Sequence, residues 1–250
     1  MYQKICLKPL ATMRRINFSI PFALVLIGLL GACQSNQNTG INQNPAMRVA
    51  PAGGTLYLIS DLLKSPHTRF TGIPTLTEES PFGPAVLFDG VDDQIMLAET
   101  PLAGMDSFTV EVLLRPDMGG TLEPRFLHIG EVNGSRMMLE GRLTEAGEWA
   151  VDSFLRAGEE YLVLLDMDLL HPVGEWCHVA LVVENGVARQ YVNGVFELEG
   201  ELPFHPIDGG AVSIGARANQ KHFFNGAIHS VRITPKALPP DAFMMGGLGN

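Results

Sequence analysis

The apolar residues of this chain fall in short runs separated by turn residues. The clearest case is residues 176–199, in which three extended runs are joined by Asn185-Gly186 and Asn193-Gly194. Asn-Gly favours the two-residue type I′ hairpin turn, because both central residues of that turn need a positive φ. The pattern therefore predicts three consecutive antiparallel strands.

The first of these strands is apolar on both of its faces. Ala180 and Val182 lie on one face, and Val179, Leu181 and Val183 lie on the other. A strand with one exposed face would alternate apolar and polar residues instead. We therefore expect this strand to lie inside a protein built from stacked sheets.

Similar short runs recur along the chain, and 17 prolines and 27 glycines separate them. This composition suits many short strands and turns better than long helices. The predicted strands cover residues 55–63, 85–97 (two strands around a turn), 107–116, 125–131, 137–143, 149–155, 211–216 and 223–234. Residues 160–170 are strongly apolar and fit either a strand or a short helix. The pattern predicts an all-β protein.

Several of these segments resemble the laminin-G-like domains of the concanavalin-A-like lectin/glucanase superfamily. They are WCHVALV with YVNG in the hairpin, FDGVDD at residues 88–93, FTVEVLLRP at residues 108–116, and IGA with FNGAIHSVRI near the end. The resemblance implies a two-sheet antiparallel jelly-roll β-sandwich. We place this domain at residues 53–243, with residues 244–250 as a C-terminal tail.

The N-terminal residues 1–32 have the pattern of a secretory signal. Arg14-Arg15 precedes an apolar run that ends in small residues and Cys33. This ending resembles a bacterial lipobox, which implies that Cys33 becomes the lipidated first residue of the mature protein. A transmembrane anchor is the alternative, but the run is short for a span of about 20 residues and Pro21 interrupts it.

Residues 33–52 are rich in Asn, Gln, Gly and Pro, and we expect them to form a flexible tether. Gln34 follows the cysteine where inner-membrane lipoproteins carry Asp, which implies the outer membrane, facing the periplasm or the outside. Translation could start at Met1 or at Met13. Cys177, on a predicted core strand, is expected to be a small buried hydrophobe.

The charge balance argues against two classes of partner. The 250-residue chain has a formal net charge of −10, and residues 1–32 contain four basic and no acidic residues. Without them, 13 basic residues stand against 27 acidic ones, a charge of −14. A surface this acidic argues against nucleic acid and against electrostatic docking on anionic lipid.

Asp89, Asp92 and Asp93 cluster in the acidic turn of the FDGVDD motif. Clustered carboxylates suit Ca²⁺, a hard cation that prefers oxygen ligands. Alternatively, the carboxylates accept hydrogen bonds from neighbouring backbone amides while Gly90 supplies a positive φ. Relatives commonly carry an acidic residue in the last strand, near the ion in some members. This chain has IHSVRI there and so lacks that carboxylate, which disfavours calcium. Both interpretations remain open.

Residues 125–155 predict a polar patch on one sheet face. Alternation along three strands places four polar side chains on the same side: His128, Glu140, Arg142 and Asp152. Trp149 or Phe154 would flank them. Relatives that bind or cleave glycans use a concave sheet, so the resemblance implies a sugar-facing patch. A solvated face with internal ion pairs is the alternative.

These observations predict a lipoprotein whose non-catalytic domain binds carbohydrate or another extracytoplasmic macromolecule. A glycan-active hydrolase or lyase on the same fold is the alternative. A retaining hydrolase needs two closely spaced carboxylates, and the E-x-D-x-x-E pattern of such relatives does not occur in the chain. A lyase needs a base beside a cation, which His128 and Arg142 could supply.

Overall fold

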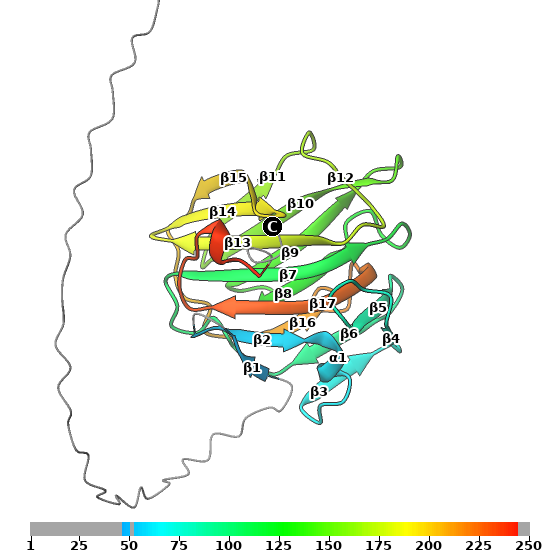
Figure 1. Cartoon of the computed structure of the whole chain (residues 1–250). Coiled ribbons are helices and arrows are strands. Elements are labelled where there is room, and N and C mark those ends of the chain that lie inside the picture. The colour runs from blue at the N-terminus through cyan, green and yellow to red at the C-terminus, as the bar shows by residue number, and fades with distance from the viewer. Residues whose placement is uncertain (1–46, 51–52, 245–250) are drawn as a thin grey trace, which may run out of the picture. The chain divides into compact units, whose positions relative to one another are not determined.

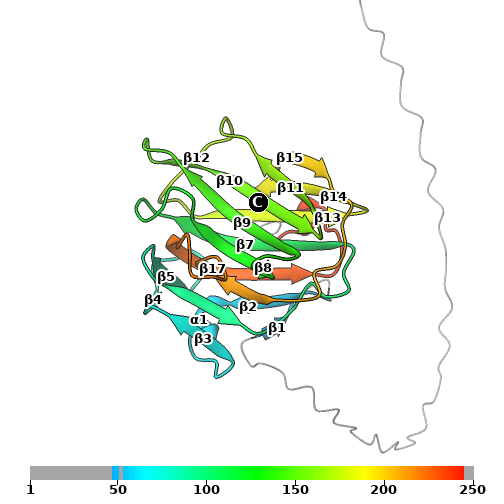
Figure 2. The same ribbon diagram turned by 180° about the vertical axis from the view of Figure 1, so that it is seen from behind.

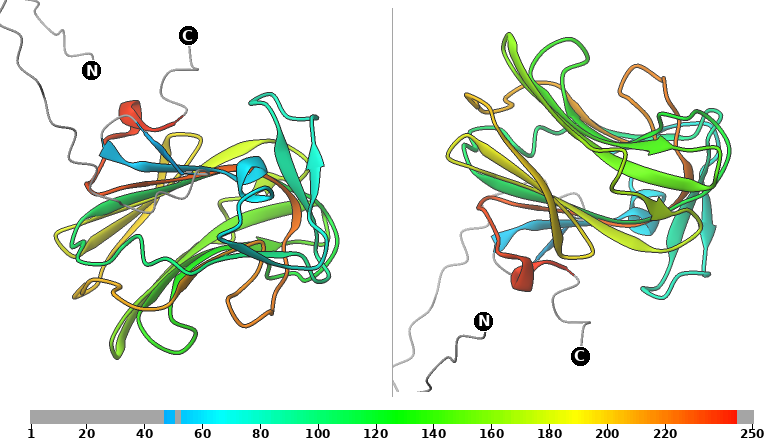
Figure 3. Two further views of the ribbon diagram at one scale, coloured as in Figure 1. Left: turned by 90° about the horizontal axis from the view of Figure 1, so that it is seen from below. Right: turned by 90° about the horizontal axis from the view of Figure 1, so that it is seen from above.

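The computed structural model describes residues 47–50 and 53–244. The described residues are almost all β, with 51% strand and 4% helix, and their strands form two antiparallel sheets that pack face to face (Figure 3). This confirms the predicted β-sandwich. The predicted signal segment, Cys33 and most of the predicted tether and tail lie outside the described residues.

The first sheet, sheet A, faces the viewer in Figure 1. Its main path runs β1 (Met47–Val49), β2 (Thr55–Leu58), β17 (Asn225–Thr234), β7 (Phe108–Pro116), β13 (Cys177–Glu184), β14 (Val187–Val192) and β15 (Val195–Glu201). Two further strands, β5 (Ala85–Asp89) and β4 (Thr75–Thr77), extend it beside β17. Because β1 pairs with β2, sheet A begins before residue 53, where we predicted the domain to start.

The second sheet, sheet B, faces the viewer in Figure 2. Its path runs β11 (Glu160–Leu165), β10 (Glu148–Ala157), β9 (Arg136–Leu143), β8 (Arg125–Gly130), β16 (Ala211–Ile214), β6 (Gln94–Leu97) and β3 (Thr68–Thr71). The short strand β12 (His171–Pro172) pairs with β10. The apolar segment that fitted either a strand or a helix therefore contains a strand.

The two Asn-Gly turns have the backbone that the sequence predicted. Asn185 and Gly186 have φ values of 53° and 78°, and Asn193 and Gly194 have values of 51° and 78°. These turns join β13, β14 and β15 as consecutive antiparallel neighbours. The predicted three-stranded unit is confirmed.

The predicted strand over residues 55–63 was too long. The strand ends at Leu58, and the short helix α1 (Ile59–Leu62) follows it. Ile59 and Leu62 are both fully buried in the core. Residues three apart lie on one side of a helical turn, so this turn buries both side chains together.

The main core lies between the sheets. It is filled by the inward residues of β7 and β13 from sheet A and by those of β8, β9 and β10 from sheet B. A smaller cluster lies on the outer face of sheet A, where Ala180, Val182 and Tyr191 pack under Leu238 and Phe243 of the C-terminal segment. Both faces of β13 are therefore buried, as predicted.

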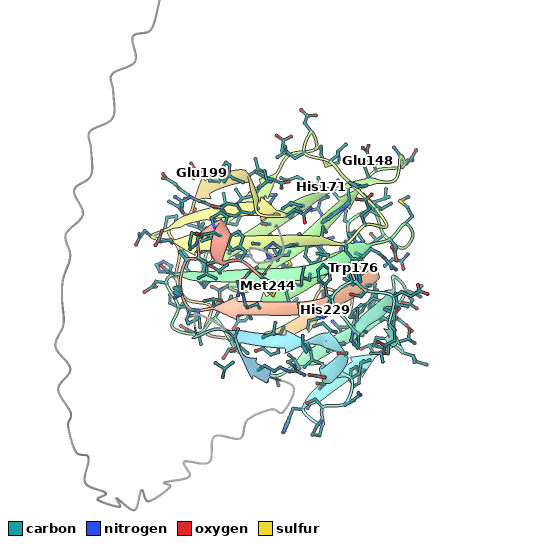
Figure 4. The ribbon with its side chains drawn as sticks, in the orientation of Figure 1. Glu148, His171, Trp176, Glu199, His229 and Met244 are labelled. Atoms are coloured by element: carbon teal, nitrogen blue, oxygen red, sulfur yellow. The ribbon has the colours of Figure 1, made fainter. Side chains whose placement is uncertain are left out.

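A buried ion pair holds the C-terminal segment on sheet A. Glu111 on β7 is fully buried and faces Arg232 on β17, whose Nε lies 2.5 Å from a Glu111 oxygen. Nε2 of His178 lies 3.0 Å from the other oxygen, to which the backbone amide of Met244 also donates at 2.7 Å. Figure 4 labels Met244 over sheet A, beyond the 3₁₀ turn η2 (Pro240–Ala242).

Within the described residues, no helix has the length and apolar character needed to cross a membrane.

Candidate functional site

The acidic turn connects the two sheets, because β5 belongs to sheet A and β6 to sheet B. Oδ1 of Asp89 accepts hydrogen bonds from the amides of Val91 at 2.8 Å and Asp92 at 3.2 Å. Gly90 has the expected positive φ, 72°. Burial acts to raise the pKa of Asp89, but the amides that donate to it lower the pKa overall. Asp89 thus has the structure of a turn-forming residue.

Asp93 is buried and joins the turn to the loop after β3. Its Oδ1 accepts from the amide of Ile73 at 2.6 Å, and its Oδ2 accepts from the amide of Asp89 at 3.0 Å. Burial raises the pKa of Asp93, although these two amides act in the opposite direction. Both carboxylate oxygens of Asp93 therefore have backbone donors.

The same turn contains the predicted calcium ligands. Ligand atoms of Asp89, Asp92 and Asp93 all lie within 4.8 Å of one another. They line a hollow of about 490 Å³ together with Asp117 and Asn225. These oxygen donors fit a hard cation. However, backbone amides account for the positions of Asp89 and Asp93 without a metal, so calcium binding stays a prediction.

The outer face of sheet B brings together three of the predicted polar residues. Arg142 lies 3.1 Å from Glu140 and 2.5 Å from Asp152. Arg125, which the alternation did not assign to the patch, lies 3.0 Å from Glu140. A bulge near the start of β8 places Arg125 opposite Glu140, and alternation alone does not predict this register.

The two carboxylates of this network are turned away from solvent. Glu140 and Asp152 are each only 2% exposed. Burial raises the pKa of both, against the opposing effect of Arg125 and Arg142. This part of the patch is an internal ion-pair network, and its arginines are its more accessible members.

His128 lies on the same face but is fully buried. Its ring nitrogens lie near the backbone of Gly130 and Glu131, but neither nitrogen makes a hydrogen bond of good geometry with the described residues. Burial lowers the pKa of His128 to about 4, and the positive charges of Arg136 and Arg217 act in the same direction. His128 is therefore neutral at neutral pH, the form that a general base needs, but it does not meet solvent, and this burial disfavours its predicted role as a base.

Trp149 does not flank the patch, which corrects our prediction. It is buried in the core between the sheets, where its ring meets Phe126 edge to face at a centroid distance of 6.3 Å. Alternation along β10 places Trp149 on the same side as Val151, which also faces the core. The sequence contained this signal.

Phe154 does lie on the outer face, where it is half-buried. It stacks on Tyr161 of β11, with ring centroids 6.2 Å apart and an interplanar angle of 13°. Tyr161 is 67% exposed. Tyr161 was not predicted as part of the patch, because the sequence pattern left the conformation of residues 160–170 undecided. Assigning a strand there would have placed Tyr161 and Val163 on one face, and the pairing of β11 with β10 makes it the face that carries Phe154.

A family model described as the concanavalin A-like lectin/glucanases superfamily matches residues 89–242, more than half of the chain. The chain belongs to this superfamily. Its concanavalin A-like domain carries both the acidic turn and the outer face of sheet B. No curated protein sequence matches the chain.

Solved structures share the fold of this concanavalin A-like domain. Domain 4 of AbnA, an extracellular arabinanase from Geobacillus stearothermophilus solved with arabinotriose, is 19% identical, with a TM-score of 0.57, covering 80% of this chain and 97% of that one. The binding domain of botulinum neurotoxin DC, solved in complex with SialylT, is 12% identical, with a TM-score of 0.50 and coverage of 70% and 44%. At these identities the likeness concerns the fold.

Proposed function

We propose that this chain is a bacterial outer-membrane lipoprotein, anchored through Cys33, whose concanavalin A-like domain binds carbohydrate without cleaving it. The observation that carries the proposal is the stacked pair Phe154 and Tyr161 on the outer face of sheet B. Exposed aromatic rings offer the flat apolar surface on which the C–H face of a sugar ring packs. Neighbouring arginines supply hydrogen-bond donors.

The comparison with domain 4 of the arabinanase supports a carbohydrate ligand, because that domain was solved with arabinotriose and has the same fold. One fold hosts many activities, so the identity of the ligand must come from the site itself. If the ligand is instead a protein, the other partner expected from the sequence, a screen of glycans should show no binding.

The site favours binding over the hydrolase or lyase alternative. Glu140 and Asp152 are buried and ion-paired with Arg142, and His128 is also buried. A catalytic acid or base must come within hydrogen-bond reach of the substrate. None of these three side chains offers that access.

The test is a glycan-array screen of the purified full-length protein, compared with Tyr161→Ala. We expect selective glycan binding that this variant weakens at least tenfold, with an unchanged melting temperature because the tyrosine is exposed. Phe196→Ala, which removes an exposed aromatic residue from sheet A, is the matched control and should bind normally. Absence of glycan binding, or binding insensitive to Tyr161, would contradict the proposal.

The lipid anchor is tested separately by labelling growing cells with radioactive palmitate. We expect Cys33 to carry the label and Cys33→Ser to lose both the label and the membrane association. Retention of the label in this variant would contradict lipidation at Cys33.

A further inference from the structure

Two arginines face each other directly on the outer face of sheet B. Arg136 on β9 and Arg156 on β10 are cross-strand partners, so their side chains leave the sheet side by side. Like charges placed directly opposite each other in a sheet are destabilising. A third arginine, Arg217, comes from the loop that follows β16 and acts electrostatically on Arg136.

Carboxylates do not neutralise this arginine cluster, which we define as Arg136, Arg156 and Arg217. Within the described chain, the one carboxylate within 4 Å of the three is that of Glu159, 3.9 Å from Arg156 and 98% exposed. An ion pair with this separation and this exposure contributes little stabilising energy. Arg125 and Arg142 on the same sheet differ, because both contact the buried Glu140.

Two of the three arginines are also short of hydrogen-bond acceptors, whereas Nε of Arg156 donates to the carbonyl of Gly158 at 2.8 Å. Arg136 is only 8% exposed. Its Nη1 donates to the carbonyl of Gly134 at 2.9 Å, and Nη2 of Arg217 donates to the carbonyl of Val132 at 2.9 Å. The Nε atoms of Arg136 and Arg217 are buried and have no partner among the described residues. Unpaired buried donors are costly, so an incoming acceptor would be favoured.

The electrostatics of Arg136 point the same way. Burial lowers the pKa of Arg136, and the charges of Arg217 and Arg156 lower it further, while Glu140 acts in the opposite direction. The folded protein therefore holds these cations together at an electrostatic cost. An anion placed among them would remove that cost.

The arginine cluster adjoins the aromatic pair. The guanidinium of Arg136 lies 4.7 Å from the ring centroid of Phe154, which in turn stacks on Tyr161. A sugar ring on Tyr161 and Phe154 would thus have the arginines beside it. Arginine recognises planar carboxylates and other oxyanions through paired N–H donors.

We propose that this face binds an acidic saccharide, one that carries a carboxylate or sulfate group, and that Arg136, Arg156 and Arg217 hold that group. The inference rests on the proposed carbohydrate-binding function and adds the chemical class of the ligand. The mature chain is acidic overall, so the attraction is local to this cluster and does not extend to polyanions in general.

The experiment measures binding of the purified full-length protein to oligosaccharides presented in acidic and neutral pairs. Each uronate is paired with its methyl ester, each sulfated sugar with its desulfated form, and each sialylated sugar with its asialo form. The variants are Arg136→Gln and the more exposed Arg156→Gln. Arg189→Gln is the matched control, because Arg189 lies on sheet A and pairs with Glu199.

We expect at least one acidic saccharide to bind at least tenfold more tightly than its neutral counterpart, with the preference falling as salt is added. Arg136→Gln and Arg156→Gln should each remove most of the preference, and Arg189→Gln should keep it. Melting temperatures of the variants should stay near that of the wild type, because each substitution relieves repulsion.

Three results overturn the inference in distinguishable ways. Equal binding of acidic and neutral partners, still dependent on Tyr161, overturns the acidic ligand and leaves the proposed function standing. Absence of saccharide binding of either kind overturns both. A preference for acidic sugars that survives in Arg136→Gln and Arg156→Gln overturns the assignment to the arginine cluster.

Discussion

Glu140 and Asp152 lie directly opposite each other on β9 and β10, and Arg142 contacts both carboxylates. Two facing acids would repel each other if both were charged and unpaired. Arg142, helped by Arg125 on the Glu140 side, allows the pair to be buried on the outer face of sheet B. The stability of this face therefore depends on Arg142.

Arg142→Ala should lower the free energy of unfolding by roughly 3 kcal/mol, because removing one partner leaves buried charge without compensation. Urea unfolding at neutral pH measures this change. Burial holds the pKa values of Glu140 and Asp152 above their ordinary values, so protonation of these carboxyls favours the folded state. The difference in the free energy of unfolding between wild type and Arg142→Ala should therefore shrink as the pH is lowered toward the ordinary pKa values of these carboxyls.

Arg189→Ala is the control for that measurement, since Arg189 and Glu199 form an ion pair at the surface of sheet A. Exposed ion pairs contribute little to stability, and we expect Arg189→Ala to change the free energy of unfolding by less than about 1 kcal/mol. A similar loss in both variants would contradict the special role of Arg142.

Glu111→Ala should destabilise the domain by roughly 3–5 kcal/mol, because it leaves Arg232 buried without its carboxylate. The amide of Met244 loses its acceptor as well. The C-terminal segment should then become sensitive to protease under native conditions, which limited proteolysis with mass spectrometry detects. If that segment stays protected in Glu111→Ala, the buried ion pair does not hold it on sheet A.

His128 should make stability depend on pH. Its pKa in the folded protein is about 4 against an ordinary 6.5, so the unfolded chain binds the proton more readily between these values. Stability from this residue is present above pH 6.5 and is lost as the pH falls toward 4, by roughly 3 kcal/mol in all.

The check is chemical denaturation at several pH values between 6.5 and 4 for wild type, His128→Gln and His205→Gln. His128→Gln should show a flatter dependence, because its side chain does not titrate. The exposed His205→Gln should follow the wild type. If the free energy of unfolding depends on pH in the same way in all three proteins, His128 is not the source of this pH dependence.

Asp93 and Asp92 should respond differently to substitution. Asp93→Ala removes the acceptor of two backbone amides, those of Ile73 and Asp89, and should cost about 2 kcal/mol or more with or without calcium. Asp92→Ala removes an exposed carboxylate and should change stability by less than about 0.5 kcal/mol in EDTA.

Calcium titration of the melting temperature completes that comparison. If the acidic turn binds Ca²⁺, the wild type should be stabilised by added calcium and Asp92→Ala should lose the effect. An identical melting temperature in calcium and in EDTA would leave Asp89, Asp92 and Asp93 as turn residues only.

Local sequence patterns were enough to predict the strands and several side-chain faces. The Asn-Gly turns predict the hairpins because glycine adopts positive φ freely and asparagine tolerates it. Alternation correctly sorted Leu127 and Ile129 toward the core and Glu140 and Arg142 toward the outer face. The same rule, applied consistently, would also have placed Trp149 in the core.

The contacts between strands could not be obtained in this way. The pairing of Arg136 with Arg156 depends on the register of β9 against β10, which local alternation leaves open. The stacking of Phe154 on Tyr161 requires β11 to be a strand at the edge of sheet B. The sequence likewise does not predict that His178 and Met244 contact Glu111, because these residues lie far apart along the chain.

The sequence by itself determined the all-β architecture, the turns and the resemblance to concanavalin A-like domains, because these follow from the conformational preferences of neighbouring residues. Only the tertiary structure decided which charged groups are buried together. The network at Arg142 and the arginine cluster at Arg136 are built from similar residues on one face of one sheet. They differ because strand register gives the first group buried carboxylates and gives the second none.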